Sequence, residues 1–74
     1  MRTIAFVLFD DAEELDFAGP WEVLAYAAKT IPGSCRVFTV AERAGPVRCG
    51  KGLRVIADFG FDDCPAADVL LVPG

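Results

Sequence analysis

Carboxylates are concentrated between the first apolar run of the chain and a Gly-Pro pair, where residues 10–16 read DDAEELD. A carboxylate close to a thiol can share a proton with it, or can orient a water molecule for addition to carbon. Asp16 is the candidate for this chemistry. From spacing alone, the favoured interpretation is that Asp16 caps a helix or lies in a solvated loop, since Asp is a common N-cap residue. Glu13 and Glu14 are expected to be solvated loop charges, with a contribution to the field at a cleft mouth as the alternative.

The chain has three cysteines and no histidine. The odd number and the absence of a CxxC spacing argue against a disulfide framework or a zinc site. Any nucleophile would therefore take its base from residues outside this chain, or from a carboxylate. Cys35 is expected to be a small core residue, because it falls in a predicted strand. Cys49 and Cys64 are expected to be unreactive, although the neighbouring Arg48 and Lys51 would favour a thiolate at Cys49.

Charge and hydropathy exclude several classes of function. The net charge is −4 and the basic residues are dispersed, so this segment has no nucleic-acid-binding signature. The longest apolar run, Ile4–Phe9, is far shorter than the roughly 20 residues that a membrane span needs. The amino terminus lacks the apolar core and cleavage site of a signal peptide. We therefore expect a soluble cytoplasmic protein.

Apolar, β-branched segments predict three strands of a β-sheet, at Thr3–Phe9, Cys35–Ala41 and Val69–Val72. The first and last show no alternation, which is typical of inner strands buried on both faces of a parallel sheet. Two shorter strands, Pro46–Cys49 and Leu53–Ile56, flank a glycine-rich turn and predict a hairpin. The remaining residues outside the helix are expected to be turns and loops. This order of elements favours the βαβ start of a doubly wound α/β fold.

A helix is predicted to begin at Gly19-Pro20, because Pro is well tolerated at the first helical position. Residues 10–16 are expected to form the loop that leads into it, and Ile31-Pro32-Gly33 is expected to end it. Apolar residues recur at helical spacing and predict one buried stripe: Phe17, Trp21, Leu24, Ala25 and Ala28. Trp21 is expected to lie in the core or at a dimer contact, with ligand stacking as the alternative.

The chain is short and apolar for a self-sufficient domain. It has 74 residues, of which 54% are hydrophobic, and a mean hydropathy of +0.42. A chain of this size buries only about 60% of the surface that it exposes when unfolded. The excess of apolar residues predicts a sheet covered partly by chain that is not here, and we expect the sequence to be truncated after its last strand.

Three segments resemble the DJ-1/PfpI superfamily, in the same order along the chain. Ile4–Leu24 contains the signature LDFAGP at residues 15–20 and is closest to the isocyanide hydratase-like branch. Gly45–Pro65, with GPV and GLRV, resembles the short excursion of the family. Asp68–Gly74, DVLLVPG, resembles the strand that leads to the family's P-G-G turn.

The resemblance implies the amino-terminal part of a flavodoxin-like (class I glutamine amidotransferase-like) parallel-sheet sandwich, which is often dimeric. It implies a cysteine nucleophile on a sharp turn beyond the P-G-G, with Asp16 in the place of the carboxylate beside that cysteine. Gly74 matches the position whose backbone N–H helps to stabilise a developing anion. The alternative for Gly74 is a plain turn with a frayed end. This chain departs from the pattern because it ends before the cysteine turn and lacks the second glycine.

The resemblance gives two hypotheses for a full-length parent. The first is a cysteine-dependent hydratase or hydrolase of small molecules, similar to isocyanide hydratase, that forms a homodimer and needs no metal or organic cofactor. The second is the ligand-sensing domain of an AraC-type helix-turn-helix transcription regulator. Under either hypothesis the segment of residues 1–74 is a partial domain and is expected to be inactive alone. A third possibility is a fragment without function.

Overall fold

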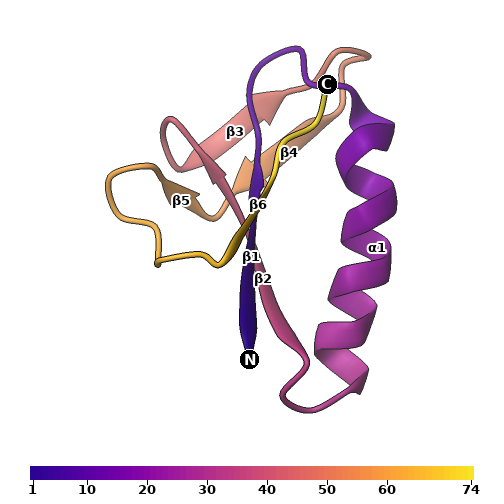
Figure 1. Cartoon of the computed structure of the whole chain (residues 1–74). Helices are drawn as coiled ribbons and strands as arrows, with labels where there is room; N and C mark the ends of the chain where they lie inside the picture. Colours follow the sequence, from indigo (N-terminus) through magenta and orange to yellow (C-terminus); the bar gives the residue numbers. More distant parts are fainter.

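A parallel sheet, a hairpin and one long helix make up the computed structural model, which describes residues 1–74 (Figure 1). The helix and the hairpin pack on the same face of the sheet, as the composition of the larger core cluster shows. In chain order, the elements are β1 (Arg2–Val7), α1 (Glu14–Thr30), β2 (Cys35–Ala41), β3 (Gly45–Arg48), β4 (Arg54–Ala57), β5 (Phe59–Gly60) and β6 (Val69–Leu71).

The main sheet has the strand order β5-β2-β1-β6, and every neighbouring pair in it is parallel. β1 pairs with β2 from Arg2↔Cys35 to Val7↔Val40, and α1 makes the crossover between them. β1 also pairs with β6, so the prediction that the two apolar ends of the chain are parallel neighbours is confirmed. Their carboxyl ends therefore lie at the same edge of the sheet.

β1 is buried on both faces, as its lack of alternation predicts: Ala5 is 1% exposed and Phe6 is fully buried. β6 is different, because it forms an edge of the sheet and its Leu70 side chain is 64% exposed. The predicted inner position of β6 depends on chain beyond these 74 residues and stays a prediction. Apolar content alone cannot distinguish a strand with two neighbours from one that has a single neighbour here.

The helix begins at Glu14, six residues before the predicted start, and Pro20 lies inside it. The prediction of a loop over residues 10–16 is therefore wrong from Glu14 onward. Glu13 occupies the N-cap position without a side-chain cap bond, so Asp16 is not the cap either. Proline cannot donate the helical hydrogen bond to the carbonyl of Asp16 and usually bends or ends a helix. The first turn of α1 is instead held by hydrogen bonds between Glu14 and the N–H of Lys51 and between Asp16 and the N–H of Gly74. These bonds compensate for the helical hydrogen bond that Pro20 cannot make.

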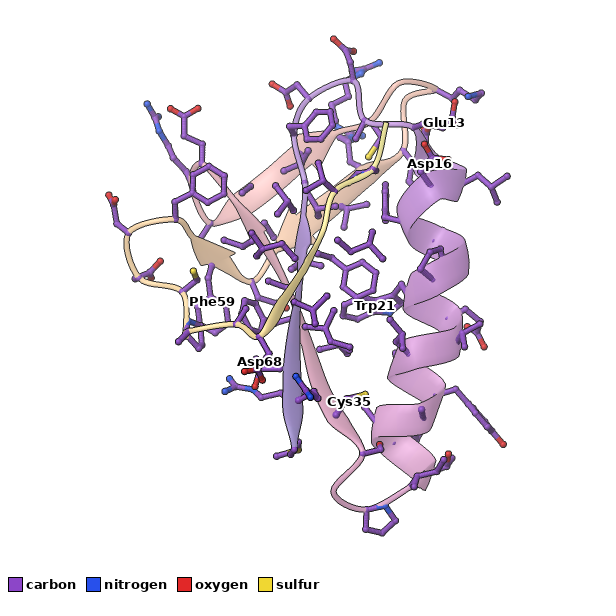
Figure 2. All side chains as sticks on the ribbon, viewed as in Figure 1. Glu13, Asp16, Trp21, Cys35, Phe59 and Asp68 are labelled. Carbon is purple, nitrogen blue, oxygen red and sulfur yellow. The ribbon has the colours of Figure 1, made fainter.

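Three residues of the predicted apolar stripe of α1, namely Phe17, Trp21 and Leu24, pack against the core formed by β1 and β2, which confirms the stripe in its amino-terminal part. Phe17 is buried, and Trp21 meets Phe6 edge-to-face with ring centroids 5.1 Å apart. Figure 2 shows the Trp21 side chain directed from α1 toward the sheet. Trp21 thus lies against the core, as expected from its place on the stripe. On the other face of the sheet, Phe38 and Phe59 make a second edge-to-face pair at 5.3 Å.

The predicted hairpin is present, with β3 and β4 antiparallel from Gly45↔Ala57 to Arg48↔Arg54. The short strand β5 was not predicted, because residues 58–65 were expected to be loop. It pairs with the end of β2. Just before this pairing, Asp58 accepts a hydrogen bond from the Thr39 N–H at 3.1 Å. A strand of two residues carries no periodicity that a sequence pattern could reveal. No helix has both the length and the apolar character required to cross a membrane.

The contact of Phe6 with α1 yields a prediction for stability. Phe6→Ala should lower the free energy of unfolding by about 3–5 kcal/mol, because it leaves a cavity beneath the helix. Phe6→Leu should lower it by less, since most of the volume is kept. Chemical denaturation of the intact protein measures both. Tyr26→Ala, on the exposed face of α1, is the control and should change the value by less than about 0.5 kcal/mol; equal losses at both positions would contradict the assignment.

Candidate active site

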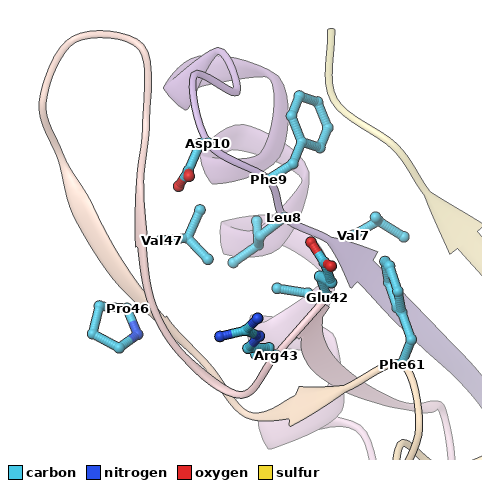
Figure 3. Close-up of a pocket in the computed structure, with 10 residues that line it drawn as sticks. Val7, Leu8, Phe9, Asp10, Glu42, Arg43, Pro46, Val47 and Phe61 are labelled. Carbon is cyan, nitrogen blue, oxygen red and sulfur yellow. The ribbon is translucent and has the colours of Figure 1, made fainter.

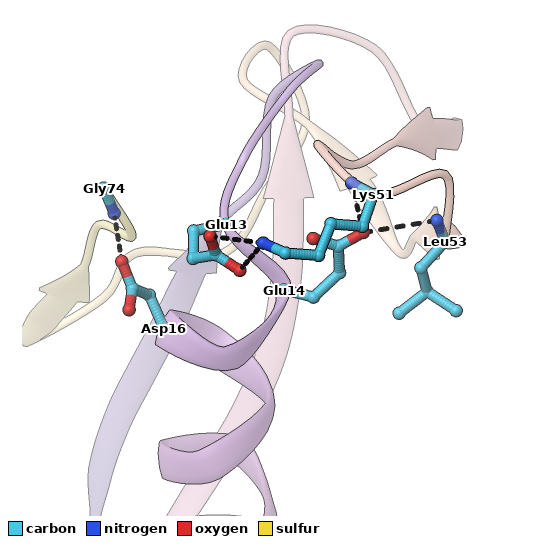
Figure 4. Close-up of polar contacts among 6 residues, drawn as sticks. All are labelled: Glu13, Glu14, Asp16, Lys51, Leu53 and Gly74. Atoms are coloured by element: carbon cyan, nitrogen blue, oxygen red, sulfur yellow. Dashed lines mark hydrogen bonds and ion pairs between the residues drawn. The ribbon is translucent and has the colours of Figure 1, made fainter.

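Asp16 and Gly74 lie together at the carboxyl edge of the sheet, where β1 and β6 end. The Gly74 N–H donates to Asp16 Oδ2 at 3.0 Å (Figure 4). The Glu13 N–H donates to the Gly74 carbonyl, also at 3.0 Å. These two hydrogen bonds tie the segment after β6 to the first turn of α1. The structure thus brings together the two residues that the resemblance singles out, although they are 58 positions apart in sequence.

The absence of a side chain at Gly74 allows this close approach. A Cβ atom at Gly74 would lie 3.1 Å from Asp16 Oδ2, closer than ordinary van der Waals contact. The Asp16 side chain is exposed, and its second oxygen, Oδ1, accepts no hydrogen bond from the chain. Asp16 therefore presents one anchored and one free carboxylate oxygen, which is an arrangement suited to accepting a proton or orienting a water molecule.

The Gly74 N–H is directed at the carboxylate of Asp16. To donate to a developing anion, the Gly74 N–H would have to release the Asp16 carboxylate or donate to both groups at once. In the structure, this N–H orients Asp16.

Glu14 joins the start of α1 to the turn between β3 and β4. Its Oε2 accepts hydrogen bonds from the N–H groups of Lys51, at 2.7 Å, and Leu53, at 3.3 Å. Partial burial of the Glu14 carboxyl by itself would raise its pKa, but hydrogen bonds from the N–H groups of Glu14, Lys51 and Leu53, with the Lys51 charge, lower the pKa overall. The prediction that Glu14 is a solvated loop charge is wrong, because Glu14 lies in α1, its Oε2 accepts two backbone hydrogen bonds and its Oε1 is shielded from solvent.

Glu13 forms an ion pair with Lys51, whose Nζ lies 2.6 Å from both carboxylate oxygens. The pKa of Lys51 is raised mainly by this hydrogen bond; partial desolvation opposes the rise, and the carboxylates of Glu13, Glu14 and Asp16 add to it. The Lys51 side chain is 70% exposed, so the pair contributes little to stability. Its effect is to keep a positive charge at the rim of the site. The sequence pattern did not single out Lys51 as a site residue: it stood only in a glycine-rich turn and as a basic neighbour of Cys49.

None of the three cysteines forms a hydrogen bond with Asp16. Cys49 is 2% exposed, and burial raises the pKa of its thiol, with a further increase from the Glu14 and Asp10 carboxylates. Burial and these two carboxylates therefore outweigh the basic neighbours Arg48 and Lys51, and the Cys49 thiol stays protonated. Cys35 packs against the core and Cys64 is half-buried, and all three thiols are free. No group of acidic or sulfur side chains is arranged to hold a metal ion.

A hollow lies at the carboxyl ends of β1 and β2, lined by residues other than those around Asp16 (Figure 3). Its buried floor consists of Leu8, Ala41 and Val47, and the sequence pattern did not reveal it. The charged residues Asp10, Glu42 and Arg43 are among those that line it. In open α/β sheets, ligands bind beyond the carboxyl ends of strands, which is where both this hollow and Asp16 are found.

Comparison with known proteins gives relatives over nearly the whole chain. The DJ-1/PfpI family matches residues 2–74. The isonitrile hydratase of Pseudomonas putida is 38% identical over 71 residues, which make up 96% of this chain and 29% of that protein. This chain therefore spans less than a third of the length of that curated relative.

Solved structures confirm the predicted α/β fold. The oxidized DJ-1 of Toxoplasma gondii is similar with a TM-score of 0.82 at 19% identity, over all of this chain and 39% of its own. A DJ-1 superfamily protein from Agrobacterium tumefaciens has a TM-score of 0.69 at 28% identity, over 38% of its chain. An AraC family transcriptional regulator from Pseudomonas putida has a TM-score of 0.79 at 19% identity, over 40% of its chain.

The lowered pKa of Glu14 predicts a pH-dependent attachment of the hairpin turn. The contribution of the carboxylate should be complete above the ordinary Glu pKa and should be lost as the pH falls through the lowered value. An NMR titration of the Lys51 and Leu53 amide protons should therefore show a midpoint below the ordinary Glu range. The same transition should be absent in Glu14→Gln. A midpoint at or above the ordinary value would contradict the assignment.

The burial of Cys49 predicts slow reaction with thiol reagents. In the native protein at neutral pH, iodoacetamide should alkylate Cys49 at least about tenfold more slowly than Cys64, because its thiol is both covered and protonated. Peptide mass spectrometry measures the two rates. In denaturant the rates should converge; preferential labelling of native Cys49 would show that the thiol is accessible.

Proposed function

Because the chain belongs to the DJ-1/PfpI family, we propose that it is the amino-terminal part of a cysteine-dependent hydratase of small molecules, with Asp16 as the active-site carboxylate. The relative at 38% identity is an isonitrile hydratase, which makes an isonitrile the first substrate class to test. The proposal includes a cysteine-dependent hydrolase of small molecules, which would use the same thiol and carboxylate. The nucleophilic thiol is supplied by sequence beyond this chain, because none of its own cysteines contacts Asp16.

The observation that carries this proposal is the position of the Asp16 carboxylate. It lies at the carboxyl edge of a parallel sheet, where α/β proteins bind ligands, and the Gly74 N–H holds one of its oxygens at 3.0 Å. The other oxygen accepts no hydrogen bond, and the Asp16 side chain is exposed. A carboxylate with one fixed oxygen can move a proton at the other without changing its orientation.

Hydration of an isonitrile, R–NC, consumes one water and gives the formamide R–NH–CHO. In the proposed reaction, a thiol adds across the terminal carbon, so that sulfur bonds to carbon and the thiol proton is transferred to that carbon. Water then displaces the thiol: its oxygen becomes the formyl oxygen, and its two protons restore the S–H and supply the N–H. Asp16 relays these protons, and the Gly74 N–H keeps its carboxylate aligned.

The exposed surface of the sheet supports the proposal that the domain continues. Val69, Leu70 and Val72 are 44%, 64% and 63% exposed along the edge strand β6 and the residue after it. An apolar, unpaired edge of this kind is normally covered by further chain. We include in the proposal that the full-length protein is a homodimer, which would cover exposed apolar residues such as Ile56 on β4.

A ligand-sensing domain of an AraC-type transcription regulator is the second candidate. It is favoured by the TM-score of 0.79 with an AraC family regulator, a likeness that at 19% identity concerns the fold alone. In such a protein, Asp16 and Gly74 would bind a small ligand instead of turning it over. The full-length protein would then bind DNA through a different domain, since this segment is acidic.

Replacement of Asp16 tests the enzymatic proposal. In the full-length protein, Asp16→Asn should lower kcat for isonitrile hydration by about 10²–10⁴-fold, because it removes a proton-transfer group and keeps the side-chain shape. Formamide release is followed by chromatography. Glu22→Gln, an exposed carboxylate on the same helix, is the matched control and should retain turnover.

The outcomes separate the two candidates. Unchanged turnover in Asp16→Asn, with circular dichroism like that of the wild type, would remove Asp16 from the active site. Absence of turnover in the wild type, together with ligand-dependent binding to its own promoter DNA in fluorescence anisotropy, would favour the regulator.

A further inference from the structure

The turn of the β3–β4 hairpin supports the start of α1 on the side away from Gly74 (Figure 4). The N–H groups of Lys51 and Leu53 donate to Glu14 Oε2, at the first residue of α1. The Gly50 N–H donates to the carbonyl of Ala12, two residues before the helix, at 2.8 Å. Gly74 binds Asp16 and Glu13 from the other side. The first turn of α1 therefore lies between two partners that are distant in sequence.

The contact with the hairpin turn is tight at the backbone. A Cβ atom at Gly50 would lie 3.2 Å from the Asp11 carbonyl oxygen, which leaves almost no room for a side chain. The backbone of Gly50 does not adopt a positive φ, so the close approach and not the torsion requires glycine there. Asp11 itself has a φ of +71°, a left-handed conformation that is uncommon outside glycine. Its N–H donates to the Arg48 carbonyl at 2.9 Å, which holds that conformation in place.

Glu14 makes this contact at an energetic cost. Its second oxygen, Oε1, is shielded from solvent and has no hydrogen-bond partner. A shielded, unpaired carboxylate oxygen is destabilising, and the charge-assisted bonds from Lys51 and Leu53 must offset that loss. A glutamate that served only solubility would point both oxygens into water. The arrangement suits a residue that fixes the position of the turn it begins.

We propose that Glu14, through the hairpin turn at residues 50–53, is a positioning residue that sets the Asp16 carboxylate against Gly74. The two carboxylates are two residues apart in the first turn of α1, so release of Glu14 from the hairpin lets that turn shift and carries Asp16 with it. A shift of about 1 Å in a reacting group can cost about 10²-fold in rate. The effect on turnover rests on the proposed function of Asp16, whereas the effect on the hydrogen bond with Gly74 does not.

The test uses two variants that loosen the contact from opposite sides. Glu14→Ala removes the acceptor, and Gly50→Ala forces the turn away while leaving every carboxylate in place. Both should raise the hydrogen-exchange rate of the Gly74 amide, measured by NMR in the intact protein, by at least about tenfold, because that N–H loses its fixed partner. Glu22→Ala, an exposed glutamate on the same helix, should leave the rate unchanged.

Turnover provides the second readout. If the full-length protein hydrates isonitriles, Glu14→Ala and Gly50→Ala should lower kcat at least about tenfold with little change in KM, since alignment and not binding is lost. Glu14→Gln keeps an oxygen that can accept the two N–H bonds and should stay within about threefold of the wild type. A structural role in folding alone would not give this rescue by glutamine together with a split between kcat and KM.

The outcomes distinguish this proposal from the proposed function. Faster exchange at Gly74 in both variants supports the positioning role even if the wild type proves to have no hydratase activity, a result that would overturn only the proposed function. Exchange at Gly74 that is unchanged in a folded Gly50→Ala protein overturns the positioning role. An equal loss of turnover in Glu14→Gln and Glu14→Ala also overturns it, because the charge of Glu14 would then act directly.

Discussion

The parallel pairing of β1 with β6 is the constraint on which the site depends. The two strands pair from Ile4↔Val69 to Phe6↔Leu71. Two hydrogen bonds one residue before the first pair reinforce this register: the Asp68 N–H donates to the Thr3 carbonyl, and the Thr3 N–H donates to Asp68 Oδ2, both at 2.8 Å. Because parallel strands end at the same edge of a sheet, this register brings the segment after β6 to the segment after β1. The hydrogen bond between Gly74 and Asp16 follows from that alignment and could not form if the two strands were antiparallel.

The residues that hold the fold together and the residues of the site are largely different. Phe6, Phe17 and Trp21 pack in the interior, where burial of apolar surface supplies most of the stabilisation. Asp16 is exposed and the Glu13–Lys51 ion pair is solvated, so neither contributes much to stability. Glu14 stands between the two groups, since it is partly desolvated and joins the hairpin to the helix. Site chemistry can therefore vary in this fold with little effect on its core.

The differences between sequence and structure concern the places where distant contacts override local preferences. Gly19-Pro20 has the local character of a helix start, yet the helix begins at Glu14 because that residue binds the hairpin turn and Glu13 binds Gly74. β5 exists because the end of β2 offers it a partner, and its two residues have no strand pattern of their own. β6 has the composition of an inner strand but only one neighbour in this chain.

The sequence by itself determined the α/β class, the helix stripe, the hairpin and the parallel placement of the end strands. Those features follow from hydrophobic period and from the turn residues between segments, which are local and can be read along the chain. Asp16 and Gly74 became candidates through the resemblance of their motifs to the DJ-1/PfpI family, since spacing alone favoured a helix cap or loop for Asp16 and a plain turn for Gly74. Only the tertiary structure decided where the helix begins, that Lys51 contacts Glu13 and Glu14 beside Asp16, and that Cys49 is buried. Each of these depends on a partner about 35 or more positions away, and the pattern of side chains within one segment does not identify such a partner.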